Sequence, residues 1–256
     1  MVAEPLIIYL FAEVTIRAIL DHFMGRHKIT AHGDATGKLI RVNIYYGRTI
    51  YLYSFVVNVA GTVLPLIQMI SALHDQDVIG GMLSKFRVFV TNVLNRQWPC
   101  IGRVITDCSF AIIHAIMREW NGTTLERYLT ACYLYVQGKY TVVDFNEVVI
   151  HRLCKNHWIK MVCNNLQGHL YARGKKTIIV ECIVKMMQCK KMSDFDEVLQ
   201  HLAVILLTPI KHELVDQAFR ALALDPSTLA QTEVEVPVVV NIADELDEHK
   251  FVCVET

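Results

Sequence analysis

The sequence lacks an excess of charge of either sign, since 25 lysines and arginines balance 25 aspartates and glutamates. A neutral total gives no electrostatic footprint of a nucleic-acid-binding protein, although a local basic patch is compatible with it. The 8 cysteines are spread over 256 residues without close pairing, which is typical of reduced intracellular thiols and not of a disulfide framework. The first apolar run, residues 5–12, lacks the basic flank of a signal peptide. We therefore expect an intracellular protein without a signal peptide.

Long runs without charge are scarce, and residues 49–73, TIYLYSFVVNVAGTVLPLIQMISAL, are the main one. Its 25 residues have the length of a membrane span. However, Gly61 and Pro65 interrupt the run, and its first half is rich in Tyr, Val and Phe. These features favour a buried strand, a turn and the start of a helix. With 53% hydrophobic residues the chain can bury a core, and we expect no membrane partner.

The apolar residues change their period along the chain, which predicts an α/β protein. The predicted strands are 27–34, 38–46, 49–59, 103–107 and 146–153. The predicted helices are 4–24, two within 64–94, 109–120, 123–137, 155–166, 175–190, 194–207 and 211–223. Short turns join the first three strands, which favours an antiparallel meander, whereas helices precede the last two strands and allow parallel pairing. In such sheets, functional side chains collect at one edge, where strands end.

Two aspartates stand at predicted strand ends. Asp34 ends the first strand in HGDATG, and Asp107 ends the fourth in VITDCS. If these strands are neighbours, the two carboxylates face each other, and they repel unless a divalent cation lies between them. With a third acid, such a pair holds two Mg²⁺ or Mn²⁺ ions for attack on phosphate. The alternative is structural: Asp107 caps the helix that follows, and Asp34 sets a turn.

A second candidate site is CKNHWIKMV, where Cys154 and His157 have the C-x₂-H spacing of half a zinc site. Cys163 and His169 are candidate third ligands for Zn²⁺. The alternative is a packed cysteine beside a histidine on the surface of a helix.

Four segments, AHGDATGKLIR, VLPLIQMIS, RVITDCSFAIIHAI and RLCKNHWIKMVC, resemble the transposase domain of Mutator-like elements (MULEs). The likeness is strongest to transposase-derived proteins of insects and other invertebrates, and it runs from about residue 27 to about residue 205. It implies an RNase H-like mixed sheet, a three-strand meander plus two further strands, with flanking helices and a C-terminal helical insertion. It also implies a DDE motif in which Asp34 and Asp107 are the first two acids, and it matches Cys154 and His157 to the family's C-x₂-H step.

The implied reaction is Mg²⁺- or Mn²⁺-dependent cleavage and transfer of double-stranded DNA at transposon ends, in the nucleus. In the family the third acid follows the insertion, in a segment similar to Asn-x-x-Glu. Here NIADELDEHK, residues 241–250, offers Asp244 and Glu245, and Glu181 lies inside the insertion. We expect a truncated, catalytically incomplete domain. The alternatives are an active nuclease or transposase that uses Glu245 or Asp244, and a non-enzymatic helical interaction protein.

The expected organisation has four parts. They are an N-terminal helix (1–26), an RNase H-like core (27–166), a helical insertion (167–231) and an acidic tail without assignment (232–256). The sequence predicts no oligomeric state.

Overall fold

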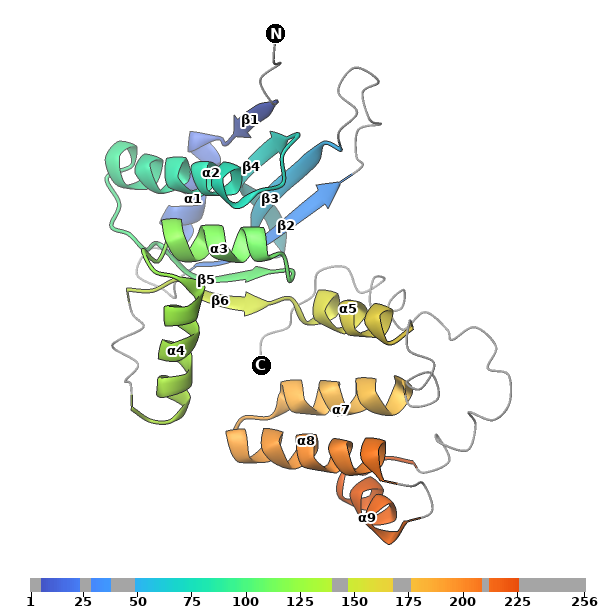
Figure 1. Cartoon of the computed structure of the whole chain (residues 1–256). Helices are drawn as coiled ribbons and strands as arrows, with labels where there is room; N and C mark the ends of the chain where they lie inside the picture. Colours follow the sequence, from blue (N-terminus) through green and yellow to red (C-terminus); the bar gives the residue numbers. More distant parts are fainter. Residues whose placement is uncertain are drawn as a thin grey trace. The chain divides into compact units, whose positions relative to one another are not determined.

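A six-stranded mixed sheet organises the N-terminal part of the computed structural model, which describes residues 6–23, 29–37, 49–139, 147–167, 176–208 and 212–225. The chain divides into two units, Met1–Cys154 and Lys155–Thr256. The described residues form eight α-helices besides the sheet, and the protein is therefore a mixed α/β structure (Figure 1). None of these helices is long and apolar enough to cross a membrane.

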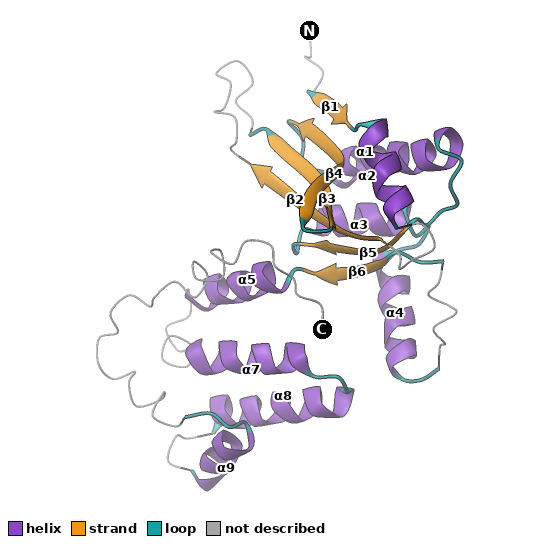
Figure 2. Cartoon of the chain, turned by 180° about the vertical axis from the view of Figure 1, so that it is seen from behind, coloured by secondary structure: helices purple, strands orange, loops and turns teal. Residues whose placement is uncertain are grey.

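The strands follow the order β1-β4-β3-β2-β5-β6 across the sheet (Figure 2). β2, β3 and β4 form an antiparallel meander, β5 pairs in parallel with β2, and β6 pairs in parallel with β5. The bounds are β1 Ile7–Leu10, β2 Ile29–Gly37, β3 Tyr51–Val59, β4 Thr62–Ser71, β5 Ile101–Thr106 and β6 Ile150–Leu153. A meander with two further parallel strands agrees with the predicted sheet, although its members differ in part.

The third strand of the meander is β4, and the prediction of a helix from residue 64 is wrong there. Ala60 and Gly61, both at positive φ, turn the chain tightly from β3 into β4. The register shifts opposite Phe55 and Val56, and this bulge leaves both Leu66 and Ile67 buried. The bulge interrupts the two-residue period of the strand. The apolar residues Leu64, Ile67 and Ile70 then have a spacing that is typical of a helix.

The first predicted helix, 4–24, is also wrong in its first half. Residues Ile7–Leu10 pair with β4 as the edge strand β1, and helix α1 spans only Glu13–His22. α1 contacts β3 and β4 and buries Ile16, Ile19 and Leu20. Pairing with β4 gives backbone N–H and C=O groups of these four residues hydrogen-bond partners outside the segment.

The other predicted strands vary in outcome. Strands 49–59 and 103–107 are confirmed within two residues as β3 and β5, and β6 occupies the end of predicted strand 146–153. Strand 27–34 is confirmed as β2, but β2 continues to Gly37 through the residues predicted as a turn. Predicted strand 38–46 lies outside the described residues.

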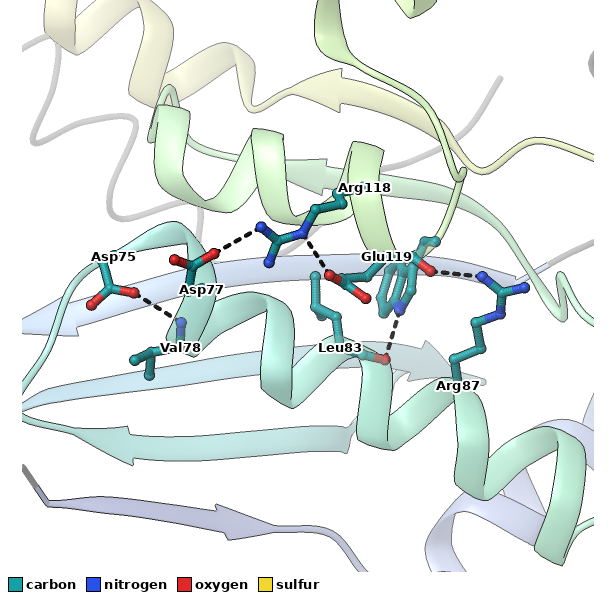
Figure 3. A network of polar contacts seen from close by, with 8 residues as sticks. Asp75, Asp77, Val78, Leu83, Arg87, Arg118 and Glu119 are labelled. Atoms are coloured by element: carbon teal, nitrogen blue, oxygen red, sulfur yellow. Dashed lines mark hydrogen bonds and ion pairs between the residues drawn. The ribbon is translucent and has the colours of Figure 1, made fainter.

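Helices α2 (Gln76–Val88) and α3 (Phe110–Glu119) lie side by side on one face of the sheet (Figures 1 and 2). A π-helical turn, Phe89–Val93, extends α2. Figure 3 shows a network of polar contacts at these helices, in which Arg118 of α3 binds Asp77 of α2 (2.7 Å) and its own neighbour Glu119 (2.6 Å). The buried Trp120 indole donates a hydrogen bond to the Leu83 carbonyl oxygen at 3.2 Å. These contacts join α2 to the C-terminal end of α3.

The remaining helices confirm their predictions within a few residues. α4 spans Leu125–Val136 in the first unit, and the second unit holds α5 (Lys155–Gln167), α7 (Lys176–Gln188), α8 (Met192–Leu207) and α9 (Glu213–Ala221). The second unit has a hydrophobic core of its own, which includes Ile178, Cys182, Ile205 and Phe219. Trp158 of α5 packs against this core, so α5, which the sequence grouped with residues 27–166, belongs to the second unit. Tail residues 232–256 lie outside the described ranges.

Candidate functional site

Four strands end at the same edge of the sheet. β2, β5 and β6 are mutually parallel, and β4 runs in their direction because it is antiparallel to β3. The N-termini of α2 and α3 follow β4 and β5 directly. Functional groups of an α/β sheet collect at the carboxyl ends of its strands. We therefore expect the site residues at this edge.

Asp34 and Asp107 directly follow the last pair in the register of β2 with β5. Gly33 on β2 pairs with Thr106 on β5, so the next position on each strand is occupied by an aspartate. Neighbouring strands lie about 4.8 Å apart, and β5 ends at Thr106, directly before Asp107. β2 and β5 are therefore the neighbours that a shared carboxylate site requires. Asp34 does not end its strand, however, because β2 continues to Gly37.

Each carboxylate already accepts one backbone hydrogen bond. Oδ1 of the exposed Asp34 accepts from the Ala35 N–H at 2.8 Å. Oδ1 of the half-buried Asp107 accepts from the Ser109 N–H at 3.0 Å, at the start of α3. The second contact agrees only in part with the structural alternative for Asp107: the N-cap residue of α3 is Ser109, and Asp107 accepts the N–H of that residue and none from the helix itself. Within the described ranges, neither Oδ2 atom accepts a hydrogen bond, which leaves one oxygen of each carboxylate for a ligand.

Cys154 follows β6, the strand next to β5, as Asp107 follows β5. Leu153 on β6 pairs with Thr106, and the Cys154 N–H donates to the Thr106 carbonyl oxygen at 2.6 Å. Cys154 therefore follows β6 at the level at which Asp107 follows β5. Burial, together with Asp107 and Cys154, raises the pKa of the Cys108 thiol. The sequence placed Cys154 in a separate zinc half-site and did not predict its position beside Asp107.

The other predicted ligands that the structure describes belong to the second unit. His157 is exposed in the first turn of α5, Cys163 is half-buried on the same helix, and Glu181 is exposed on α7. His169, Asp244 and Glu245 lie outside the described residues. Where the chain is described, no group of three or more His, Cys, Asp or Glu side chains is arranged to hold a metal ion. The zinc site at Cys154 and His157 stays a prediction.

A histidine between the two helices predicted within residues 64–94 lies at this edge. His74, between β4 and α2, has its Nδ1 atom 2.6 Å from the Tyr53 hydroxyl and its Nε2 atom 3.5 Å from Ser109 Oγ. Burial, followed by the proximity of Tyr51 and Asp75, raises the pKa of Tyr53. The signal in the sequence is a histidine next to a helix-capping aspartate after an apolar run, but it becomes visible only when residues 62–71 are known to form a strand.

Comparison with known proteins connects the chain to a mobile genetic element. No family model matches the sequence, and no solved structure matches it. The chain is 24% identical over 161 residues to the "120.7 kDa protein in NOF-FB transposable element" of Drosophila melanogaster. The matched region covers 62% of this chain but only 14% of that protein. The chain is thus similar to a protein encoded by a transposable element and spans a small part of its length.

Proposed function

We propose that the chain is an RNase H-like domain derived from a MULE-type transposase, in which Asp34 and Asp107 bind one divalent cation without cutting DNA. The strand order β4-β3-β2-β5-β6 supports the fold assignment, because it is the three-strand meander plus two further strands that the resemblance implies. The similarity to the transposable-element protein supports the origin. The partner proposed on this basis is double-stranded DNA, in the nucleus.

The observation that supports the proposal is the register that pairs Gly33 with Thr106, the residues that directly precede Asp34 and Asp107. Two carboxylates on adjacent strands repel each other, and a divalent cation relieves that repulsion. The donor set fits Mg²⁺ or Mn²⁺, since these ions prefer carboxylate oxygens and, among the described residues, no hydrogen bond occupies the Oδ2 atom of either aspartate. A cation bound there would polarise a phosphoryl oxygen of the nucleic acid.

The same arrangement argues against strand cleavage. In-line attack on phosphate uses two cations, which two aspartates and a third acid hold together. The described residues contain no third acid beside this pair. The neighbour of Asp107 on the far side is Cys154, whose thiolate suits zinc better than magnesium. We therefore expect cation binding to survive and phosphoryl transfer to be lost.

The test combines Mn²⁺ titration with a nicking assay on supercoiled DNA that carries element ends. Wild-type protein should bind one Mn²⁺, and Asp34→Asn and Asp107→Asn should each weaken binding by tenfold or more. Asp216→Asn, which changes an exposed carboxylate on α9, serves as the matched control and should bind as wild type does. None of these proteins should nick DNA.

Two outcomes would replace the proposal. Mn²⁺-dependent nicking that both Asp107→Asn and Glu245→Gln abolish would establish an active enzyme with Glu245 as its third acid. Absence of Mn²⁺ binding by the wild type would leave the non-enzymatic interaction protein. The hydrogen bond from Ser109 to Asp107 favours that last alternative, because it gives Asp107 a structural role without a cation.

A further inference from the structure

A continuous hydrogen-bonded chain connects the buried side of the sheet to Asp107. It begins at Tyr53 on β3, which is fully buried, and passes through His74 to the Ser109 hydroxyl. Ser109 then donates its backbone N–H to Asp107 Oδ1 at 3.0 Å. The four residues come from three separate segments of the sequence, and only the fold brings them together at the edge that carries the two aspartates.

The contacts of Tyr53 determine which nitrogen of His74 carries the proton. The Tyr53 hydroxyl has one proton and two neighbours, the Leu73 carbonyl oxygen at 3.2 Å and His74 Nδ1 at 2.6 Å. A carbonyl oxygen can only accept, so the arrangement that satisfies both contacts has Tyr53 donating to Leu73 and accepting from an Nδ1–H group. Neutral His74 then presents the lone pair of Nε2 to Ser109 Oγ, which donates its proton.

The His74 ring is held on several sides although the residue lies at the surface. It stacks on the Tyr53 ring at a centroid distance of 5.8 Å and lies 4.9 Å from the Tyr51 ring. The Leu73 N–H donates to Ser71 Oγ at 3.0 Å, and Asp75 Oδ1 accepts from the Val78 N–H at 2.8 Å. The loop on both sides of His74 is thereby fixed, so the ring orientation is set before any ligand binds.

We propose that His74 is a positioning residue of the Asp34–Asp107 cation site. Tyr53 holds the His74 ring, and His74 orients Ser109. The Ser109 N–H then fixes Asp107 Oδ1, so that Oδ2 faces the cation. This inference rests on the proposed function, because it gives His74 a role only where Asp107 binds a cation. Residues that orient metal ligands through hydrogen bonds typically change metal affinity by about 10- to 100-fold.

Two substitutions distinguish the role of His74 Nδ1 from the role of His74 Nε2. His74→Asn places a polar atom near the position of Nδ1, so it keeps the contact to Tyr53 and loses Ser109. His74→Gln reaches the position of Nε2, so it keeps an acceptor for Ser109. We expect His74→Asn and Ser109→Ala to weaken Mn²⁺ binding by about tenfold. We expect His74→Gln to recover most of the affinity, and the exposed His22→Asn serves as the control.

The tautomer is measured independently by ¹⁵N NMR of histidine-labelled protein above pH 8. Wild-type His74 should be protonated at Nδ1, and Tyr53→Phe should shift the population toward Nε2–H. An Nε2–H tautomer in the wild type, or equal Mn²⁺ affinities of His74→Asn and His74→Gln, would overturn the positioning role while the cation site stands. Failure of the wild type itself to bind Mn²⁺ would overturn the proposed function and this role together. Equal thermal stability of the Asn and Gln variants would show that their difference in affinity is not a folding defect.

Discussion

Gly33 of β2 and Thr106 of β5 face each other as the last paired residues of two parallel strands. Each is followed by an aspartate, so the pairing of two uncharged residues sets Asp34 beside Asp107. A shift of one residue in this register would send the two side chains to opposite faces of the sheet.

Asp107 should stabilise the fold by accepting the Ser109 N–H, whether or not its side chain is charged. Asp107→Ala removes the acceptor for the Ser109 N–H and should lower the free energy of unfolding by about 1 kcal/mol in the absence of metal. Asp107→Asn keeps an acceptor oxygen and should unfold close to wild type. Urea denaturation of the three proteins with a chelator present measures this difference. Equal stability of all three would mean that the hydrogen bond to Ser109 contributes nothing.

Gly33 should tolerate no side chain. A Cβ atom at this position would lie 2.5 Å from Cε1 of Phe55, whose ring is fully buried and packs against Trp120 at a centroid distance of 5.6 Å. Gly33→Ala should therefore destabilise the protein by about 1–3 kcal/mol through overpacking.

Adding Phe55→Leu should recover part of that loss, because it removes the atoms that the new methyl group meets. The double-mutant cycle gives the coupling between the two positions. Strictly additive effects of the two substitutions would contradict the contact between Gly33 and Phe55.

Trp120 should be the most sensitive contact between α2 and α3. Trp120→Phe removes the indole N–H that donates to Leu83 and part of the packing against Phe86, and should cost about 1–2 kcal/mol. Trp98→Phe is the matched control: it removes an indole that is only half-buried and donates at 3.0 Å to the Trp120 carbonyl oxygen. Trp98→Phe should lower the free energy of unfolding, measured by urea titration, by less than Trp120→Phe does. A larger loss for Trp98→Phe would contradict the central role of Trp120.

Stability should decrease in mild acid because of His151. Burial lowers the pKa of His151 from 6.5 to about 4, while Nε2 lies 2.8 Å from Thr106 Oγ1. Because the unfolded chain binds more protons than the folded one between these values, the contribution is fully present above about pH 6.5 and is lost as the pH falls toward 4. The slope from this group is at most about 1.4 kcal/mol per pH unit.

The measurement is the free energy of unfolding of wild type and His151→Gln at several values between pH 4 and 7. His32, whose pKa burial also lowers, contributes in the same direction, so the variant should flatten the slope without removing it. Identical slopes for the two proteins would contradict a buried neutral His151.

Much of the architecture follows from local pattern. The helices of the second unit have strong apolar periodicity, and β3 and β5 are β-branched or aromatic runs between turn residues, so their positions were predictable. Asp34 and Asp107 were candidates because each follows or ends a predicted strand, and their joint role as a site stays a prediction. β4 was not, since the bulge at Leu66 disturbs the period of the strand, and β1 was not, since only pairing with β4 stabilises so short a segment.

The sequence by itself determined the α/β class, and it singled out Asp34 and Asp107, of which only Asp107 directly follows the end of its strand. The tertiary structure decided which groups meet. It set Cys154 at the level of Asp107 through the β5–β6 register, and it brought Tyr53, His74 and Ser109 into one hydrogen-bonded chain. Strand register and loop packing depend on residues distant in the sequence, and no local period encodes them.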